Sequence, residues 1–285
     1  MCLKPSIRIL RHDSQSGFSL IELLVTMFIS GVMMTLMTGF FRANVAIRYD
    51  MSLQTETQQG LRALFDMLSQ ELRQAGACLP HQGQFIALDG ENNGNQDSVT
   101  LRIGRTDATT LRCIKAGTSA SVTNSATLPF SAGDGAQFEN ADLVYVTPNG
   151  ATGDFYRVLS NTSSSVTINT ADDFPAGTGV YAIDERVYQI ETINDRPVLT
   201  VQMDGGASYP LVDGVQQLNV QYWLESTTTP NTLESTPQNL PADDSAWLRV
   251  RKLTLSAKVE ARKPSKDGDV STESGSIDIK PRNLL

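Results

Sequence analysis

The chain has 285 residues, of which 40% are hydrophobic, and it carries a formal net charge of −8. This length and composition are typical of a globular protein with one large or two small domains. The acidic charge argues against nucleic acid as the main ligand, because duplex binding draws much of its affinity from neutralised phosphates.

Residues 1–17 have the composition of a leader peptide. They are basic and polar, with Lys4, Arg8 and Arg11 against Asp13, and they lack the apolar central region of a secretory signal peptide. Their removal leaves a chain with a net charge of −10. By the positive-inside rule, this segment predicts a cytoplasmic N-terminus, with the bulk of the chain on the other side of a membrane.

An apolar run follows the leader, from Phe18 to Phe41, and its only charged residue is Glu22. As a helix, these 24 residues rise about 1.5 Å each and span roughly 36 Å, which is enough to cross a bilayer core. A carboxylate in a membrane span costs a few kcal/mol, so it normally has a partner or a task. We therefore expect a transmembrane segment over about 18–41, with a functional Glu22.

The stretch from Gly17 to Val25, GFSLIELLV, resembles the processing signal of type IV pilins and type II secretion pseudopilins. The resemblance implies that a prepilin peptidase cuts between Gly17 and Phe18 and that Phe18 is then N-methylated. It also implies that Glu22 guides filament assembly by facing the α-amine of Phe18 on a neighbouring subunit. The alternatives are a plain membrane anchor and a Glu22 carboxylate that stays protonated at the membrane edge.

The helix is expected to continue to residue 76, because no proline interrupts the chain before Pro80. After Arg42 the pattern becomes amphipathic. One apolar stripe recurs at helical spacing and needs a sheet to cover it: Leu61, Leu64, Phe65, Leu68, Leu72 and Ala75. Gly76 and Pro80 supply the stop signal.

Three cysteines are present, and Cys2 lies in the expected leader. The remaining pair, Cys78 and Cys113, is an even count in an exported domain, which favours a disulfide. It would close a loop of about 35 residues and contribute roughly 3–4 kcal/mol. The alternative is two unrelated buried thiols. Nothing in the sequence has zinc-ligand spacing.

Residues 77–285 are expected to form a β-rich head domain. Short β-type runs recur between turn signals, at 85–88, 98–103, 110–114, 142–147, 155–159, 165–169, 180–192, 197–203, 218–224, 248–261 and 276–280. Residues 226–245 are polar and contain proline, which indicates a surface excursion. In the run 248–261, Val250, Leu253, Leu255 and Val259 need a bulge or a change of face to share one side. The predicted class is α+β, with a long N-terminal helix packed on a mainly antiparallel sheet.

The segment after the helix contains a partial calcium-loop pattern. Asp89, Glu91, Asn93 and Asp97 carry oxygen at alternate positions, but Thr100 stands where a bidentate glutamate is expected. The alternative is a polar turn rich in Asn and Gly. We expect no cofactor and no metal.

No enzymatic motif is visible in the sequence. The two histidines, His12 and His81, rule out a multi-histidine zinc site, and no nucleophile elbow or phosphate-binding glycine loop is present. Two short charge clusters, 184–186 and 249–252, are more typical of a solvated strand face than of a site. The alternative is that either lies at a contact with another pilin. We therefore expect a non-catalytic protein.

Three further segments resemble PilW-type minor pilins: Ala75-Gly76-Ala77-Cys78, the Asp-Gly-Val-x-x-Leu-x-Val-x-Tyr pattern at 213–222, and Pro281-Arg282-Asn283. The resemblance implies a single-pass inner-membrane protein with a periplasmic head, which joins the other minor pilins and the major pilin in a surface pilus. The alternatives are a J-type minor pseudopilin of type II secretion, a DNA-uptake pilin, and a membrane-anchored periplasmic enzyme or binding protein whose leader is never cut.

Overall fold

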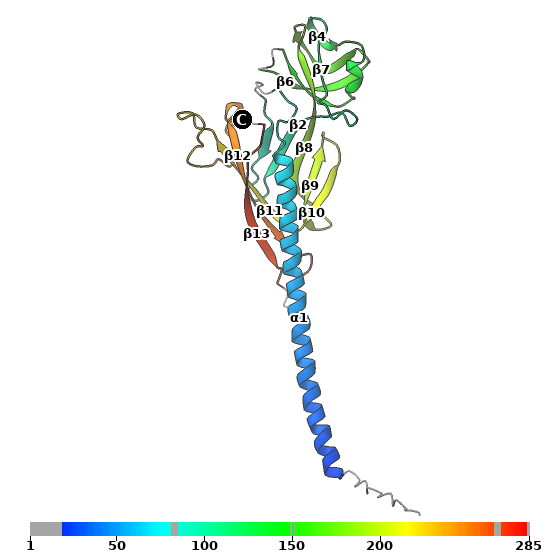
Figure 1. Ribbon diagram of the computed structural model, residues 1–285, viewed down its shortest axis with the longest axis vertical. Coiled ribbons are helices and arrows are strands. Elements are labelled where there is room, and N and C mark those ends of the chain that lie inside the picture. The colour runs from blue at the N-terminus through cyan, green and yellow to red at the C-terminus, as the bar shows by residue number, and fades with distance from the viewer. Residues whose placement is uncertain (1–18, 81–84, 149, 151, 265–268, 284–285) are drawn as a thin grey trace, which may run out of the picture. The chain divides into compact units, whose positions relative to one another are not determined.

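The computed structural model describes residues 19–80, 85–148, 150, 152–264 and 269–283 (Figure 1). The chain divides into two compact units, residues 1–51 and 52–285. One helix, α1 (Leu20–Leu72), contributes to both units. In the second unit its buried side chains recur every three or four positions, so they form one face: Leu53, Thr57, Leu61, Leu64, Leu68 and Leu72.

The helix α1 ends before the expected boundary at residue 76. After Arg73 the amides of Gln74 and Ala75 bond three residues back instead of four, as in the 2.9 Å bond from Gln74 N to Glu71 O. Gly76 then takes a φ of +73°, which a glycine adopts without steric cost. Its amide donates to the carbonyl of Arg102 over 3.1 Å, so a strand satisfies the backbone where the helix stops.

Ten strands form one antiparallel sheet around the long strand β8 (Gly179–Ile193). The first part of β8 pairs with β3 and β5, and the rest pairs with β2 and β9. Outward from these neighbours, β1 pairs with β2, and β10 pairs with β9. On the side of β5, the strands follow in the order β6, β7 and β4. The remaining bounds are β1 Leu88–Glu91, β2 Ser98–Gly104, β3 Lys115–Gly117, β4 Val122–Pro129, β5 Leu143–Thr147, β6 Asp154–Asn161, β7 Ser165–Phe174, β9 Arg196–Met203 and β10 Ser208–Asp213, with a 3₁₀ turn η1 at Asp134–Gln137.

A second, three-stranded antiparallel sheet has the order β11 (Val215–Leu224), β12 (Val250–Glu260) and β13 (Thr272–Ile279). The short helix α2 (Asp244–Trp247) lies in the excursion between β11 and β12. The register of this pair shifts between Trp223 and Leu224. This is the irregularity expected from the sequence, and it leaves four apolar side chains of β12 buried: Val250, Leu253, Leu255 and Val259.

The main core lies between the C-terminal part of α1 and both sheets, as Figure 1 shows for the second unit. A Cβ built on Gly275 of β13 would lie 3.2 Å from Leu61 and Phe65, so helix and small sheet pack closely. On the larger sheet, Arg186 of β8 forms an ion pair with Glu71 of α1. A second apolar cluster fills the space among β4–β8, with Phe138 and Leu128 fully buried.

The α+β class and the antiparallel sheets are confirmed. Two expected strands are wrong. Residues 85–87 are not in a strand. Residues 110–114 are turn and coil apart from an isolated bridge between Cys113 and Thr106, because the Asp107 carboxylate binds the amides of Thr109 and Thr110 and turns the chain. The edge strands β4 and β10 were not predicted from the sequence, since β4 is polar and β10 contains Pro210.

Candidate assembly site

The first turn of α1 is closed by Glu22. Its Oε2 atom accepts a hydrogen bond from the backbone amide of Ser19 over 3.3 Å, and the amide of Leu23 donates to the carbonyl of Ser19. This is half of a capping box, in which the residue at the third helical position reaches back to the N-cap. The pattern Ser-x-x-Glu could have been recognised in the sequence. Gly17 and Phe18, the expected cleavage residues, lie outside the described residues.

The N-terminal part of α1 exposes its apolar side chains. Phe28, Met34 and Phe40 are 75%, 74% and 69% exposed, and no described residue from 19 to 51 is buried. The segment is long and apolar enough to cross a membrane. A surface this apolar needs a bilayer or other protein around it, because water does not solvate it favourably.

The three threonine hydroxyl groups of the apolar segment are satisfied within the helix. The hydroxyl groups of Thr26, Thr35 and Thr38 donate to carbonyls three or four residues earlier, over 2.9, 2.7 and 2.7 Å. In an apolar medium an unpaired hydroxyl would be costly, so these internal bonds suit a helix without water around it. A shallow groove of about 510 Å³ runs along Gly31, Met34, Thr35, Thr38, Gly39 and Arg42, where small residues permit close approach of another helix.

A disulfide joins Cys78, in the turn after α1, to Cys113, in the loop before β3. The two Cα atoms are 5.4 Å apart and the residues are separated by 35 positions. Gly104, at the end of β2, packs directly against this turn: a Cβ there would lie 2.6 Å from the Cβ of Cys78. Its amide also donates to the carbonyl of Ala77 over 2.7 Å. The disulfide therefore secures the junction between helix and sheet.

The candidate calcium residues have separate structural roles. Asp97 is 3% exposed, and its two oxygens accept from the amides of Asn93 and Val220, over 3.2 and 2.9 Å. It thereby ties the polar loop to β11. Asp89 contacts Arg102 across 3.4 Å, while Glu91 is exposed at the end of β1. Among the residues that the structure describes, no group of three or more His, Cys, Asp or Glu side chains could hold a metal ion.

The two charge clusters, which were expected to be solvated faces, consist mostly of partly buried ion pairs. Besides the Arg186 pair with α1, Glu185 pairs with Arg102 across 2.8 Å. In the second cluster, Arg249 pairs with Glu234 across 2.8 Å and Arg251 with Glu225 across 2.9 Å. The second cluster thus holds the excursion between β11 and β12, and the expectation of a solvated face is wrong.

The Asp184 carboxylate on β8 is destabilised in its ionised form. Burial raises the pKa of Asp184 above its ordinary value of 3.8, and the neighbouring Asp204 acts in the same direction. Nearby Arg186 and Arg105 oppose the shift without cancelling it. No described residue donates a hydrogen bond to this carboxylate. Such a shift can mark a functional site, but among the described residues Asp184 belongs to no group of three or more side chains that could hold a metal ion.

Comparison with known proteins identifies the N-terminal part of the chain. Residues 12–38 match a family model described as the prokaryotic N-terminal methylation motif. No curated protein and no solved structure matches the chain. The chain therefore carries a type IV pilin-like signal, which supports a pilin-like or pseudopilin subunit and membrane anchoring by the apolar helix.

Proposed function

We propose that this chain is a PilW-like minor pilin, a non-catalytic subunit that helps to initiate or cap a type IV pilus. One observation carries the proposal. The methylation motif leads directly into a helix segment whose apolar side chains are all turned outward. A plain anchor needs only a bilayer around such a segment, whereas a filament subunit also needs side chains that pack against other helices.

Processing supplies the first step of the mechanism. A prepilin peptidase cuts the bond between Gly17 and Phe18, and the new α-amine of Phe18 is methylated. The leader, residues 1–17, is removed, and the apolar segment becomes the N-terminus of the mature chain. The match over residues 12–38 supports this step, because it spans both the proposed cleavage point and Glu22.

Assembly is the second step. The exposed Glu22 carboxylate faces the Phe18 amine of a neighbouring subunit, where the low dielectric of the filament core strengthens the attraction. The groove along Gly31, Thr35 and Gly39 gives a neighbouring helix a surface for close packing. The internally bonded threonines allow the same helix to leave the bilayer for the filament without exposing unpaired hydroxyls.

The head domain supplies specificity. It lies in the periplasm before assembly, where the disulfide between Cys78 and Cys113 persists in the oxidising environment. Its partners are the other minor pilins and the major pilin. The PilW-like segments around 213–222 and 281–283 favour this assignment over a J-type pseudopilin.

Deletion of the gene in its native host tests whether the chain serves a type IV pilus or type II secretion. We expect loss of surface pili, restored by the wild-type gene, with secretion of type II substrates unchanged. Loss of secretion with normal pili would assign the chain to the type II system instead. Normal pili and normal secretion would contradict both assignments.

A further inference from the structure

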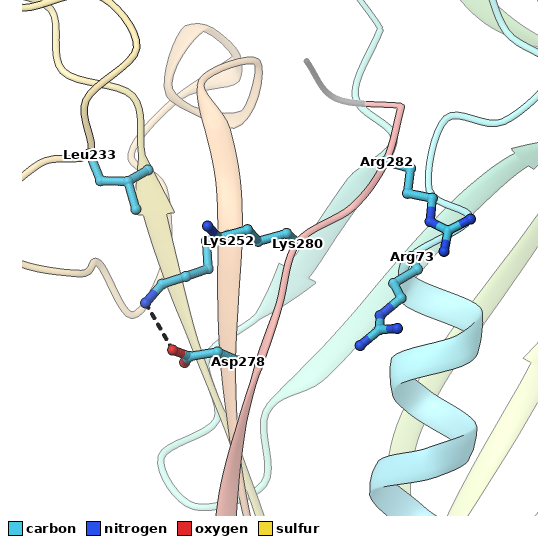
Figure 2. A pocket seen from close by; sticks show the side chains of 6 residues that line it. All are labelled: Arg73, Leu233, Lys252, Asp278, Lys280 and Arg282. Carbon is cyan, nitrogen blue, oxygen red and sulfur yellow. Dashed lines mark hydrogen bonds and ion pairs between the residues drawn. The ribbon is translucent and has the colours of Figure 1, made fainter.

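A basic pocket lies on the head domain where the end of α1 meets the small sheet. The pocket has a volume of about 490 Å³ and is lined by Arg73, Leu233, Lys252, Asp278, Lys280 and Arg282. Four of these six residues are basic, in a chain whose net charge is −8. Figure 2 shows how they come from separate segments: the end of α1, the excursion before β12, β12 itself, and β13 with the residues that follow it.

One part of the pocket is neutralised from within. Lys252 Nζ lies 3.1 Å from Asp278 Oδ2, and the Thr254 hydroxyl donates to Asp278 Oδ1 over 2.7 Å. These hydrogen bonds lower the pKa of Asp278, with the contact from Thr254 as the largest cause. The Lys252 ammonium also lies 4.1 Å from the centre of the Trp223 ring. This lysine is therefore already paired.

Three cations remain unpaired in the pocket. Arg73, Lys280 and Arg282 are exposed, and no described carboxylate lies within 4.0 Å of their charged nitrogens; Lys280 only adds, after Lys252, to the lowering of the Asp278 pKa. The amide of Arg282 donates to the carbonyl of Arg73 over 3.1 Å, so the two guanidinium groups start from adjacent backbone, as Figure 2 shows. Like charges held this close repel each other, and a bound anion would remove that cost.

We propose that this basic pocket binds the carboxylates of an acidic segment on a neighbouring protein subunit. This proposal rests on the proposed function, because a pilus subunit meets other subunits through its head. Guanidinium groups bind carboxylates through two parallel hydrogen bonds, which gives orientation as well as affinity. Leu233 is the single apolar residue of the six, too little for insertion into lipid. The basic residues are confined to one pocket, whereas nucleic acid needs a row of phosphate contacts.

The three unpaired side chains can be changed without touching a described hydrogen bond, since the bond between Arg73 and Arg282 uses only backbone atoms. The test variant is therefore Arg73→Gln/Lys280→Gln/Arg282→Gln. A matched control is Arg62→Gln/Arg112→Gln/Lys115→Gln, which removes the same residue types from exposed positions outside the pocket. Full-length protein in non-ionic detergent is titrated with a capped peptide of alternating glutamate and glycine, and with the same peptide carrying glutamine. Trp223 fluorescence reports binding, because Lys252 contacts both the ring and the pocket.

The glutamate peptide is expected to bind wild type and control equally, and to bind the test variant at least about tenfold more weakly, since several charge-assisted hydrogen bonds are lost. The glutamine peptide is expected not to bind. Binding that is equal in all three proteins, or absent in wild type, would overturn the proposal. So would pocket-dependent binding of inorganic phosphate or of vesicles containing phosphatidylglycerol without binding of the peptide.

The melting temperature of the test variant distinguishes a purely structural role of the three cations from a role in peptide binding. The arginines lie near the C-terminus of α1, where positive charge stabilises the exposed carbonyls. A test variant that has a lower melting temperature but binds the peptide like wild type would assign them that role and overturn the proposal that the pocket binds carboxylates. The N-terminal residue of the same protein, prepared from the native host, reports on processing, so failure of the pocket is distinguishable from failure of the proposed function.

Discussion

The backbone amide of Ser19 lies 3.3 Å from the Oε2 atom of Glu22 and donates a hydrogen bond to it. Glu22 therefore has two separable properties: it accepts a hydrogen bond that begins α1, and it carries the single negative charge of the apolar segment. Glutamine at this position of a capping box accepts the same hydrogen bond but has no charge. The substitution to glutamine thus separates helix capping from charge pairing.

If charge pairing with Phe18 drives assembly, Glu22→Gln and Glu22→Ala will both reduce the protein in sheared filaments. We expect a loss of at least about tenfold, since about 1.4 kcal/mol of lost contact energy is a factor of ten. Only Glu22→Ala also removes the acceptor of the Ser19 amide, a single hydrogen bond worth about 1 kcal/mol. Immunoblots of filament and membrane fractions measure the effect. Normal recovery of Glu22→Gln would show that capping, and not charge, is the property that assembly requires.

The contact between Gly104 and the turn at Cys78 predicts that alanine is much more destabilising at Gly104 than at Gly117. Gly104→Ala places a Cβ 2.9 Å from the carbonyl oxygen of Cys78, which cannot move freely. We expect a loss of about 1–3 kcal/mol in the free energy of unfolding, as for overpacked cores. Gly117→Ala is the control, because nothing lies within 4 Å of its added Cβ. Urea unfolding curves with equal midpoints for the two variants would contradict this packing.

Loss of the disulfide should destabilise the head. The bond spans 35 positions, and removal of such a crosslink by Cys78→Ser/Cys113→Ser is expected to cost about 3–4 kcal/mol through the larger entropy of the unfolded chain. Unfolding by urea measures this. Reductant should lower the midpoint of wild type to that of the variant and leave the variant unchanged. A wild-type midpoint that is insensitive to reductant would be inconsistent with a stabilising disulfide.

Asp97 is expected to act through its hydrogen bonds and not through calcium. Asp97→Ala leaves the buried amide of Val220 without its acceptor, which should cost about 1–3 kcal/mol. Glu91→Ala removes an exposed side chain and should change stability by less than about 0.5 kcal/mol. Thermal melts with calcium and with chelator are expected to coincide for wild type. A melting temperature that rises with calcium and no longer does so in Asp97→Ala would restore the calcium hypothesis.

Asp184 gives a pH dependence with a defined sign. Because burial raises its pKa in the folded state, ionisation of this group opposes folding. The protonated form of Asp184 contributes its full stability below the ordinary pKa of 3.8, and this contribution is lost as the pH rises through the folded pKa. Asp184→Asn cannot ionise, so it should be more stable than wild type at neutral pH, with a difference that disappears in acid.

Urea unfolding as a function of pH tests this sign. Asp66→Asn, on an exposed position of α1, controls for the loss of one negative charge. A destabilised Asp184→Asn protein at neutral pH would mean that attraction to Arg186 and Arg105 outweighs burial.

Periodic patterns were the most reliable sequence signals. The stripe from Leu61 to Leu72 predicted the buried face of α1, and alternation predicted the long strands β8, β11 and β12. Edge strands were missed because burial, which produces alternation, is weak at an edge. The end of α1 also depended on a partner distant in sequence, since Arg102 supplies the acceptor for Gly76.

The functional regions also differ in whether they depend on local sequence or on contacts between residues distant in sequence. The stretch around Gly17, Phe18 and Glu22 is local, so the sequence indicated it directly, and a family model matches it. The basic pocket is not local: Arg73 follows α1 and Arg282 follows β13, and they become neighbours only because the chain after β13 returns to the end of α1. No spacing or composition could have predicted that meeting.

The most direct test of the pilin assignment is the intact mass and N-terminal sequence of the protein purified from membranes of its native host. The account predicts a chain that begins at N-methylated Phe18, with residues 1–17 absent. A chain that retains Met1 in a host with an active prepilin peptidase would contradict it, and the protein would then be an uncleaved membrane anchor that carries a β-rich head.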